Sequence, residues 1–485
     1  MHRPPALFAL LACLLAACTD PDSSPPPADL PPPPPPLPSV DGLTPLEDRN
    51  PDPYIVEVDL VARTSFAQLR PGEPTELLNY NDSFPGPLLH ARVGDRVIVH
   101  FTNELADPTV IHWHGLRISD QMDGSPRIQA PVEPGGTFTY DFVVPEAGTF
   151  WYHTHLHQIE QHERGLYGAI VVHDAEPPAF SAERLVIVDD IRLDATNRVS
   201  PFLTSGPDIG RGRIGNTLLR NGSSEPWRIS IPRGAIERWR VVLSTNALSV
   251  GLRVAGADAR VIATDGGLLP QPFALDRVEI APGQRYDLEI RPRPDAADVA
   301  LDAMILVLDE NDNVVEEPFP LIIATVEGQT ETPEPIYPVV TLPSTEVQAE
   351  TLDWKISGAL VDGKVHFTIN GVSGFVDDDH QHPLLHTFQP NVPVRMTIRS
   401  DVSPAHPFHL HGQFFQIIER KGQPVFEPGL RDTVEIRGAE TATILSYFEN
   451  PGRWMVHCHI SEHGENGMMA EIQVGAPEEH SAHHP

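Results

Sequence analysis

The feature that most restricts the fold of this chain is a segment that recurs at long intervals. Residues 94–103, 234–246 and 391–401 each read as a turn followed by a strand in which apolar and polar residues alternate. Successive side chains on a strand point to opposite faces, so each copy predicts a strand with one face toward a core. Three copies of one pattern predict three domains of similar structure.

Length and composition agree with three domains built from strands. The chain has 485 residues, and a domain size of roughly 100 to 200 residues suggests about three domains. Its 52 prolines and 35 glycines interrupt helices, and the many short runs rich in Val, Ile, Thr and Phe are typical of strands. We therefore expect an all-β protein of consecutive sandwich or barrel domains.

The N-terminus predicts export. Residues 1–18 combine a basic start, a short apolar run and the sequence Leu-Ala-Ala-Cys ending at Cys18, which resembles the bacterial lipobox with its lipidated cysteine. Ordinary cleavage beside the small residues is the alternative. We expect either a lipoprotein of the bacterial envelope, in the periplasm or at the outer membrane, or a secreted protein, with the membrane contacted only through the lipid anchor.

Composition shifts divide the rest of the chain. Residues 19–49 contain a run of prolines and predict a semi-rigid linker. Boundaries fall near Glu176 and within 327–350, where Gly, Thr, Glu and Pro dominate. The predicted segments are a lipoprotein-type signal at 1–18, the linker at 19–49, domains at 50–176, 177–335 and 336–476, and a histidine-containing tail at 477–485.

Histidines in the pattern His-X-His mark the first and third domains, two pairs in each. The pairs are His112/His114, His153/His155, His409/His411 and His457/His459. On a strand, residues two apart share a face and lie roughly 6.5 to 7 Å apart, so each pair suits two neighbouring metal ions rather than one. Eight imidazoles suit a cluster of three metals where the two domains meet, and the middle domain reads as a structural spacer.

Cys458, between His457 and His459, is the one cysteine beyond the signal region. Its side chain faces away from the two histidines on a strand, so it predicts a separate metal site. A Cys thiolate with two His and a weak Met ligand is the blue-copper arrangement, which His406, His463 and Met468 complete. The first domain has Thr109, Thr154 and Leu166 at the positions of His406, Cys458 and Met468.

These motifs resemble those of the three-domain multicopper oxidases, which include the laccases. The sequence has HWHG from His112, WYHTH from Trp151, HPFHLHG from His406 and HCHISEHGENGMM from His457. The resemblance covers about residues 50 to 475 and implies three consecutive cupredoxin-like Greek-key domains with four copper ions per chain. An isolated His-X-His pair is more often a chance occurrence or a zinc site.

The resemblance also implies a role for each ligand. His406, Cys458 and His463 would hold type 1 copper, with Met468 axial, and His112 and His409 would hold type 2 copper. The type 3 pair would be held by His114, His153, His155, His411, His457 and His459.

Reduction of O2 to water requires protons, and carboxylates near the cluster are candidate carriers. Asp123 matches a position at which relatives keep an acid, although Asp-Gly is also a common turn. Bacterial relatives place Glu directly after the histidine that corresponds to His463, where this chain has Gly464. Glu462 and Glu465 are therefore alternative relays, and solvated surface charge is the other interpretation of both.

We expect an oxidase that couples four one-electron oxidations to the reduction of O2 to water. Phenols and aromatic amines are the preferred reductants. A cuprous or other metal-ion oxidase is the alternative, disfavoured because only seven methionines are present. A copper-binding protein without catalysis is the third hypothesis. The net charge of −33 disfavours nucleic acid as a partner, and completion of all copper sites in one chain predicts a monomer.

Overall fold

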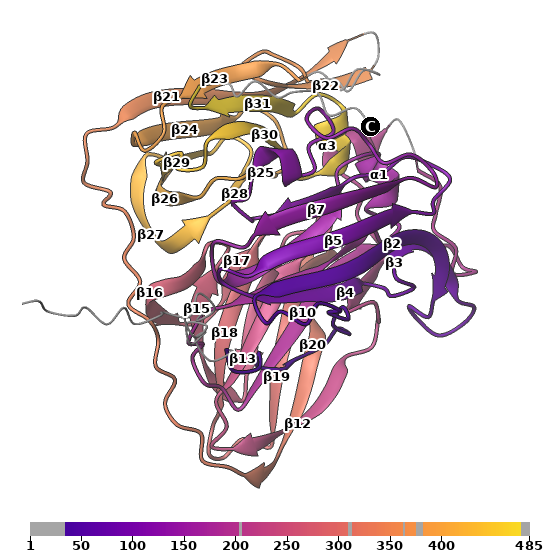
Figure 1. Ribbon diagram of the computed structural model, residues 1–485, viewed down its shortest axis with the longest axis vertical. Helices are drawn as coiled ribbons and strands as arrows, with labels where there is room; N and C mark the ends of the chain where they lie inside the picture. The colour runs from indigo at the N-terminus through magenta and orange to yellow at the C-terminus, as the bar shows by residue number, and fades with distance from the viewer. Residues whose placement is uncertain (1–33, 203–205, 309–312, 362–363, 375–381, 477–485) are drawn as a thin grey trace, which may run out of the picture. The chain divides into compact units, whose positions relative to one another are not determined.

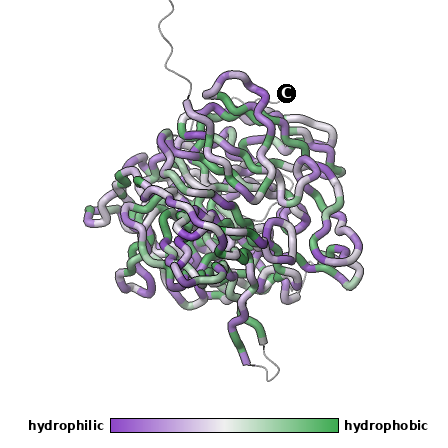
Figure 2. The backbone as a smooth tube through the Cα atoms, turned by 90° about the horizontal axis from the view of Figure 1, so that it is seen from below, coloured by the Kyte–Doolittle hydropathy of each residue, from purple (hydrophilic) through white to green (hydrophobic). Residues whose placement is uncertain are grey.

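The computed structural model describes residues 34–202, 206–308, 313–361, 364–374 and 382–476. In this part of the chain, strands β1 to β31 make up nearly all of the regular structure (Figure 1). The strands form six sheets, two from each third of the chain. The hydropathy colours alternate along the backbone tube in Figure 2, as expected for strands with one buried face.

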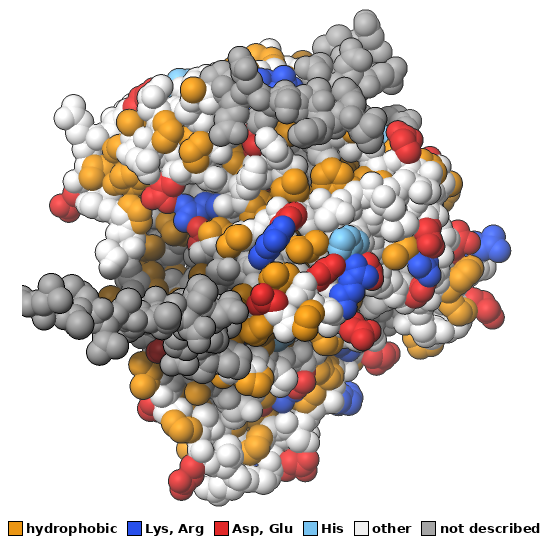
Figure 3. Space-filling model, in the orientation of Figure 1, with side chains coloured by type: hydrophobic (Ala, Val, Ile, Leu, Met, Phe, Trp, Pro, Cys, Tyr) orange, Lys and Arg blue, Asp and Glu red, His pale blue; other side chains and the backbone are white. Residues whose placement is uncertain are grey.

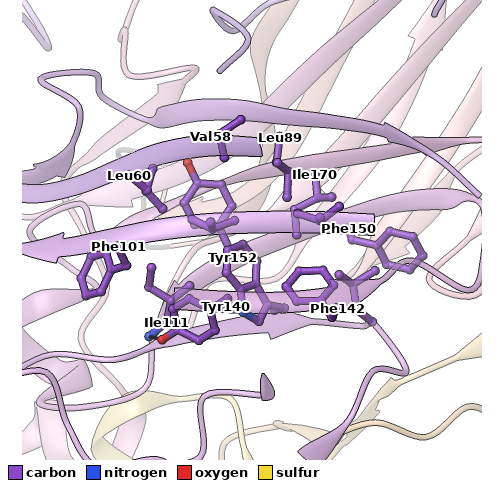
Figure 4. Packing of buried hydrophobic residues seen from close by; sticks show 14 of the residues in the cluster. Val58, Leu60, Leu89, Phe101, Ile111, Tyr140, Phe142, Phe150, Tyr152 and Ile170 are labelled. Atoms are coloured by element: carbon purple, nitrogen blue, oxygen red, sulfur yellow. Dashed lines mark hydrogen bonds between the residues drawn. The ribbon is translucent and has the colours of Figure 1, made fainter. Parts of the chain in front are cut away.

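The first domain has two four-stranded sheets. One has the order β3 (Thr75–Tyr80), β2 (Ile55–Ala67), β5 (Arg96–Asn103), β7 (Thr137–Val143). The other has the order β4 (Gly86–Arg92), β9 (Tyr167–His173), β8 (Gly148–Thr154), β6 (Ile111–His114). Strand β5 shows why the sheets pack, because its alternate residues Val97, Val99 and Phe101 are fully buried. Figure 4 shows this core, in which Tyr140 and Tyr152 lie among aliphatic and other aromatic side chains.

The middle domain has a seven-stranded and a five-stranded sheet. The larger has the order β1 (Val40–Asp41), β10 (Ala182–Ile191), β13 (Glu237–Leu243), β18 (Arg285–Pro292), β15 (Ala257–Thr264), β16 (Gly267–Ala274), with β11 (Thr217–Arg220) also paired to β10. The smaller has the order β12 (Trp227–Arg233), β20 (Val314–Gln329), β19 (Asp298–Leu308), β14 (Val250–Ala255), β17 (Val278–Ile280). A separate hydrophobic cluster fills the space between them.

The third domain has a six-stranded and a five-stranded sheet. The first has the order β22 (Lys364–Ile369), β21 (Glu350–Val361), β24 (Val394–Ser400), β29 (Thr441–Ser446), β26 (Phe415–Arg420), β27 (Gln423–Arg431). The second has the order β23 (Leu384–Phe388), β31 (Met469–Val474), β30 (Gly452–Cys458), β25 (His406–Leu410), β28 (Thr433–Ile436). Its core includes Cys458 and Met468.

The described helices are short and lie in connections between strands. They are η1 (Asp120–Met122), α1 (Gln158–Gln161), α2 (Pro207–Arg211) and α3 (Ser461–Glu465). Helix α3 contacts both α1 and α2, so elements of all three domains meet around it. No helix of the described residues is long and apolar enough to cross a membrane.

The three domains share one topology. In each domain, a central strand pairs in parallel with an earlier strand and antiparallel with a later one. The triples, in chain order and with the central strand second, are β2, β5 and β7 in the first domain, β10, β13 and β18 in the second, and β21, β24 and β29 in the third. The second strands, β5, β13 and β24, are the three sequence repeats. The fold is therefore all-β with three consecutive cupredoxin-like domains, which confirms the predicted fold class.

The predicted linker at 19–49 requires a correction at its C-terminal end. Val40 pairs in parallel with Glu183 of β10, and the Leu46 amide donates to the Leu88 carbonyl at 2.8 Å. These residues belong to the folded body because Val40 is buried and its backbone completes an edge of a sheet. The predicted signal at 1–18 and the tail at 477–485 lie outside the described residues.

Candidate metal centre

Four strands bring the His-X-His pairs together. In the first domain, β6 contains both histidines of its pair. In β8 of the same domain, and in β25 and β30 of the third, the first histidine of each pair lies in the strand and the second follows directly after it. The pairs are in register, because His112 lies opposite His153 and His409 lies opposite His457. Paired strands with matching faces therefore present four imidazoles per domain to one side.

The two sets of imidazoles meet between the first and third domains. The rings of His112 and His411 stack with centroids 3.8 Å apart, as do those of His114 and His409. The Nε2 atom of His457 lies 3.2 Å from that of His155 and 3.0 Å from that of His411. We call these eight side chains the histidine cluster: His112, His114, His153, His155, His409, His411, His457 and His459.

Hydrogen bonds at Nδ1 orient five of the eight rings. The acceptors are Asp123 O for His112 (2.9 Å), Thr154 O for His153 (2.8 Å), Asp432 O for His409 (3.0 Å), the Asp123 carboxylate for His411 (2.7 Å) and Cys458 O for His457 (2.9 Å). A carbonyl only accepts, so each Nδ1 bound to one carries the proton and its Nε2 presents a lone pair. The Nε2 atoms of His112, His153 and His409 are buried without a hydrogen-bond partner.

The protonation state of the cluster suits metal binding. Burial, followed by the neighbouring imidazoles, holds the pKa values of His153, His155 and His411 well below the ordinary value, and burial lowers that of His457 to about 4. Neutral imidazole is the form that binds metal ions. Figure 3 shows charged and hydrophobic side chains interspersed on one outer face, whereas the histidine cluster is buried.

Asp123 orients one ring from each of two domains. Its backbone carbonyl accepts from Nδ1 of His112, and a carboxylate oxygen lies 3.3 Å from the same nitrogen. The carboxylate also accepts from His411. The next residue, Gly124, has φ +87°, and a Cβ there would lie 1.9 Å from the Ile111 carbonyl oxygen. Only glycine permits this turn to approach β6 closely enough for the contact with His112.

Asp432 occupies the corresponding position in the third domain, and sequence analysis missed it. Its carbonyl accepts from His409, and its carboxylate oxygen lies 3.2 Å from Nε2 of His114 in the first domain. Burial raises the pKa of Asp432 to about 6, against the opposing effect of Arg285. No motif in the sequence marks Asp432, which lies one residue before β28.

A second group, which we call the Cys458 site, lies inside the third domain. The Cys458 sulfur is 3.7 Å from Nδ1 of His406 and 3.5 Å from Nδ1 of His463, and these nitrogens are 3.1 Å apart. Met468, fully buried in the same core, accepts a hydrogen bond from the Cys458 amide through its carbonyl. One thiol and two imidazoles converging in this way form a donor set for a soft metal ion.

The side chains of the Cys458 site are buried. Burial raises the pKa of the Cys458 thiol and lowers that of His406 to about 4. A bound cation stabilises the thiolate that burial otherwise disfavours, so the donor set fits copper. Because β30 alternates its faces, Cys458 points into the core while His457 and His459 point to the histidine cluster.

The first domain has a polar group in place of the Cys458 site. The Thr109 and Thr154 hydroxyls lie 3.2 Å apart, and both donate to the Gln161 side-chain oxygen, at 2.8 and 2.9 Å. Leu166 is fully buried, as Met468 is in the third domain. Hydroxyl and amide groups satisfy one another here, so this position lacks the soft donors of the third domain.

Comparison with known proteins identifies the family. Models of multicopper oxidase domains match residues 63–177, 192–298 and 364–478. A solved multicopper oxidase of Pseudomonas thermotolerans is 30% identical, with a TM-score of 0.74, and the match covers 87% of this chain and 99% of that one. The chain belongs to the multicopper oxidase family. It is therefore a copper-binding oxidoreductase that takes electrons from a reducing substrate and uses O2 as acceptor.

Two further relatives show the range of activities named in the family. Laccase-1 of Cryptococcus neoformans var. neoformans is 29% identical over 490 residues, covering 83% of this chain and 78% of that protein. A solved multicopper oxidase of Campylobacter jejuni, described as a metallo-oxidase, is 27% identical with a TM-score of 0.76, covering 91% of this chain and 96% of that one. The names of these relatives thus include a laccase and a metallo-oxidase.

The two glutamates of this multicopper oxidase on α3 are not solvated surface charges. Glu462 is buried and accepts from the Asn246 amide at 2.7 Å, while the half-buried Glu465 accepts from the Ile159 amide at 3.0 Å. Burial raises the pKa of Glu462 and raises that of Glu465 to about 7. Asn246 ends the repeat at 234–246, but the sequence did not indicate that its side chain contacts Glu462.

Proposed function

We propose that the histidine cluster and the Cys458 site together hold four copper ions, one of type 1, one of type 2 and a type 3 pair. The type 1 ligands are His406, Cys458 and His463 with Met468 axial, the type 2 ligands are His112 and His409, and the type 3 ligands are His114, His153, His155, His411, His457 and His459. The observation that carries this proposal is the convergence of imidazoles from two domains, with unpartnered Nε2 atoms, beside a buried cysteine.

Copper bound at these positions supplies one-electron redox chemistry and the reduction of O2. The chain itself contributes the route between the two sites, because Cys458 is covalently joined to His457 and His459. It also fixes the imidazoles before any metal binds, through the hydrogen bonds at Nδ1. Burial of both sites excludes water from the electron path.

Asp123 is our first candidate for proton delivery to the reacting oxygen. Its carboxylate is buried and already hydrogen-bonded to a cluster imidazole, His411. Glu465 is the second candidate, because a carboxyl group with a pKa near 7 exchanges protons readily at neutral pH. Glu462 is the third candidate, and its carboxylate accepts from the Asn246 amide.

The reductants that we propose are phenols and aromatic amines, as in laccases. Oxidation of Cu(I) is favoured by exposed thioether groups, because sulfur is a soft ligand. Among the described methionines, only Met122 is not buried; Met304, Met396, Met455, Met468 and Met469 all lie in cores. This distribution supports an organic reductant.

A metal-ion oxidase acting in copper tolerance is the second candidate. It is supported by the structural match to the Campylobacter jejuni protein described as a metallo-oxidase. A copper-binding protein without catalysis is the third candidate, and the full set of metal donors at both sites counts against it.

Oxygen uptake by the copper-loaded protein tests these alternatives. We expect a blue visible band and uptake with a phenol, both lost in Cys458→Ser. Oxygen uptake with Cu(I) but not with phenols would show that the protein is a metal-ion oxidase. Absence of both colour and uptake would refute the assignment of the sites.

We also propose that the protein is exported and anchored by lipid on Cys18, as its N-terminal sequence indicates. Because one chain contributes the donors of both sites, we propose that it acts as a monomer. Radiolabelled palmitate incorporation, compared with Cys18→Ser, tests the anchor, and light scattering tests the oligomeric state.

A further inference from the structure

Arg285 of the middle domain uses every hydrogen-bond donor it has. It is the first residue of β18 and is fully buried. Its guanidinium donates to the carbonyls of Thr149 (2.9 Å), Gly283 (3.0 Å) and Asp265 (2.9 Å), and to both carboxylate oxygens of Asp432 (2.9 and 2.7 Å). Five donors match five acceptors, which come from all three domains. A buried charge is tolerated when it is paired and hydrogen-bonded to this extent.

The loop before Arg285 touches the histidine cluster directly. Gly283 has φ +88°, and a Cβ at this position would lie 3.1 Å from His459 and 3.2 Å from His114. The Gly283 carbonyl accepts from Arg285, so the same side chain that reaches Asp432 also fixes this loop. The middle domain is therefore in contact with the cluster and is more than the spacer expected from its lack of histidines.

Asp432 connects Arg285 to the imidazoles of two domains. The bidentate pair with Arg285 and a 2.9 Å hydrogen bond from the Thr433 hydroxyl fix the plane of its carboxylate. In that plane, one oxygen lies 3.2 Å from Nε2 of His114, and the Asp432 carbonyl holds Nδ1 of His409. Because Nε2 of His114 contacts Asp432, its Nδ1 is the buried ring nitrogen that has no hydrogen-bond partner and can bind a metal ion.

We propose that Arg285 is a positioning residue for the oxygen-reducing copper cluster: through Asp432 it sets the orientation of His114 and His409, and through Gly283 it shapes one wall of the cluster. This inference rests on the copper assignment above. Without the guanidinium, Asp432 is a buried carboxylate that lacks its two strongest donors. It then turns or recruits another partner, and the two imidazoles lose their fixed direction.

The test compares Arg285→Gln with Arg240→Gln. Arg240 is also fully buried in the middle domain and reaches Thr149 of the first domain, but its carboxylate partners are Glu183 and Asp287 rather than Asp432. Copper per chain, the electron paramagnetic resonance signal of type 2 copper, the blue band and the thermal midpoint are measured on each copper-loaded protein.

We expect Arg285→Gln to bind copper at the cluster about 10 to 100 times more weakly, as for other residues that orient metal ligands. Its type 2 signal should change while the blue band of the Cys458 site persists. Arg240→Gln should lose thermal stability with normal copper content and signals. Full copper content and an unchanged type 2 signal in Arg285→Gln would reduce Arg285 to a structural role and overturn the proposal.

Two further variants keep the proposal testable if Arg285→Gln does not fold. Arg285→Lys retains the charge but not the planar fork, and we expect it to show the same spectral change in milder form. Asp432→Asn should reproduce the change, and its combination with Arg285→Lys should be less than additive. Additive effects would refute the coupling, whereas a wild-type protein that binds no copper would refute the copper assignment itself.

Discussion

Asn246 holds helix α3 from the middle domain, and its replacement by alanine removes that connection. The side chain accepts from the Ser461 amide at 2.9 Å and donates to the Glu462 carboxylate at 2.7 Å. All three residues are buried. Each buried partner left unsatisfied costs roughly 1 to 3 kcal/mol, so the loss of both should lower the free energy of unfolding of Asn246→Ala by about 2 to 6 kcal/mol. Because α3 carries His463, the loss should also alter the Cys458 site.

The assay is a thermal melt combined with a visible spectrum of the copper-loaded protein. Asn103→Ala is the matched control, since Asn103 is equally buried and makes three hydrogen bonds of 2.8 to 2.9 Å within the first domain, far in sequence from α3. We expect both variants to melt earlier, and only Asn246→Ala to shift or weaken the blue band. An unshifted band in a destabilised Asn246→Ala would refute the idea that the middle domain helps to set the Cys458 site.

An acidic replacement adds a pH dependence of known sign. In Asn246→Asp, a second carboxylate faces Glu462, whose pKa burial already raises. Two carboxyl groups that share a proton have at least one raised pKa. A raised pKa in the folded state gives stability at low pH that is lost as pH increases, so the variant should melt progressively earlier than wild type above about pH 4.5. A constant difference in midpoint between pH 5 and pH 8 would contradict this account.

Three further predictions concern single side chains. Asp123→Asn should reduce oxygen turnover or copper affinity about 10 to 100-fold, because the new amide cannot carry a proton; turnover at the wild-type rate would exclude a proton role. Burial and Asp190 raise the pKa of Glu163 to about 8, against the effect of Arg213, so its stabilising contribution is lost as pH rises from about 4.5 to 8. Glu163→Gln should therefore melt later relative to wild type at pH 8 than at pH 5, and the reverse order would refute the shift. Met468→Leu should raise the reduction potential of type 1 copper, measured by redox titration; an unchanged potential would show that Met468 is not an axial ligand.

The sequence predicted the parts of this structure that repeat or that follow strand geometry. The turn-strand repeats are strands β5, β13 and β24, and the His-X-His pairs lie on paired strands because alternation fixes the face of each residue. The opposite orientation of Cys458 follows from the same alternation. These predictions depend only on residues close in sequence, for which backbone geometry is enough.

The residues that sequence analysis missed are single polar groups with distant partners. Arg285 and Asp432 are separated by 147 positions, and Asn246 and Ser461 by 215. Asn246 ends one of the turn-strand repeats and Ser461 lies in the motif that starts at His457. No spacing in the sequence links either pair, however, so their meeting depends on how whole domains dock. The linker prediction was wrong near residue 40 for a similar reason, because β1 is defined by the sheet edge that it joins.

The crosswise hydrogen bonds of the cluster also constrain the order of assembly. His114 and the Asp432 carboxylate that orients it are 318 residues apart. The first domain emerges from the ribosome before the third has been made. Until then its four cluster imidazoles form half of a site, with no opposite wall to complete the coordination of an ion. On the proposed copper assignment, loading of the cluster would require the first and last domains to have docked, which would link cofactor acquisition to the completion of folding.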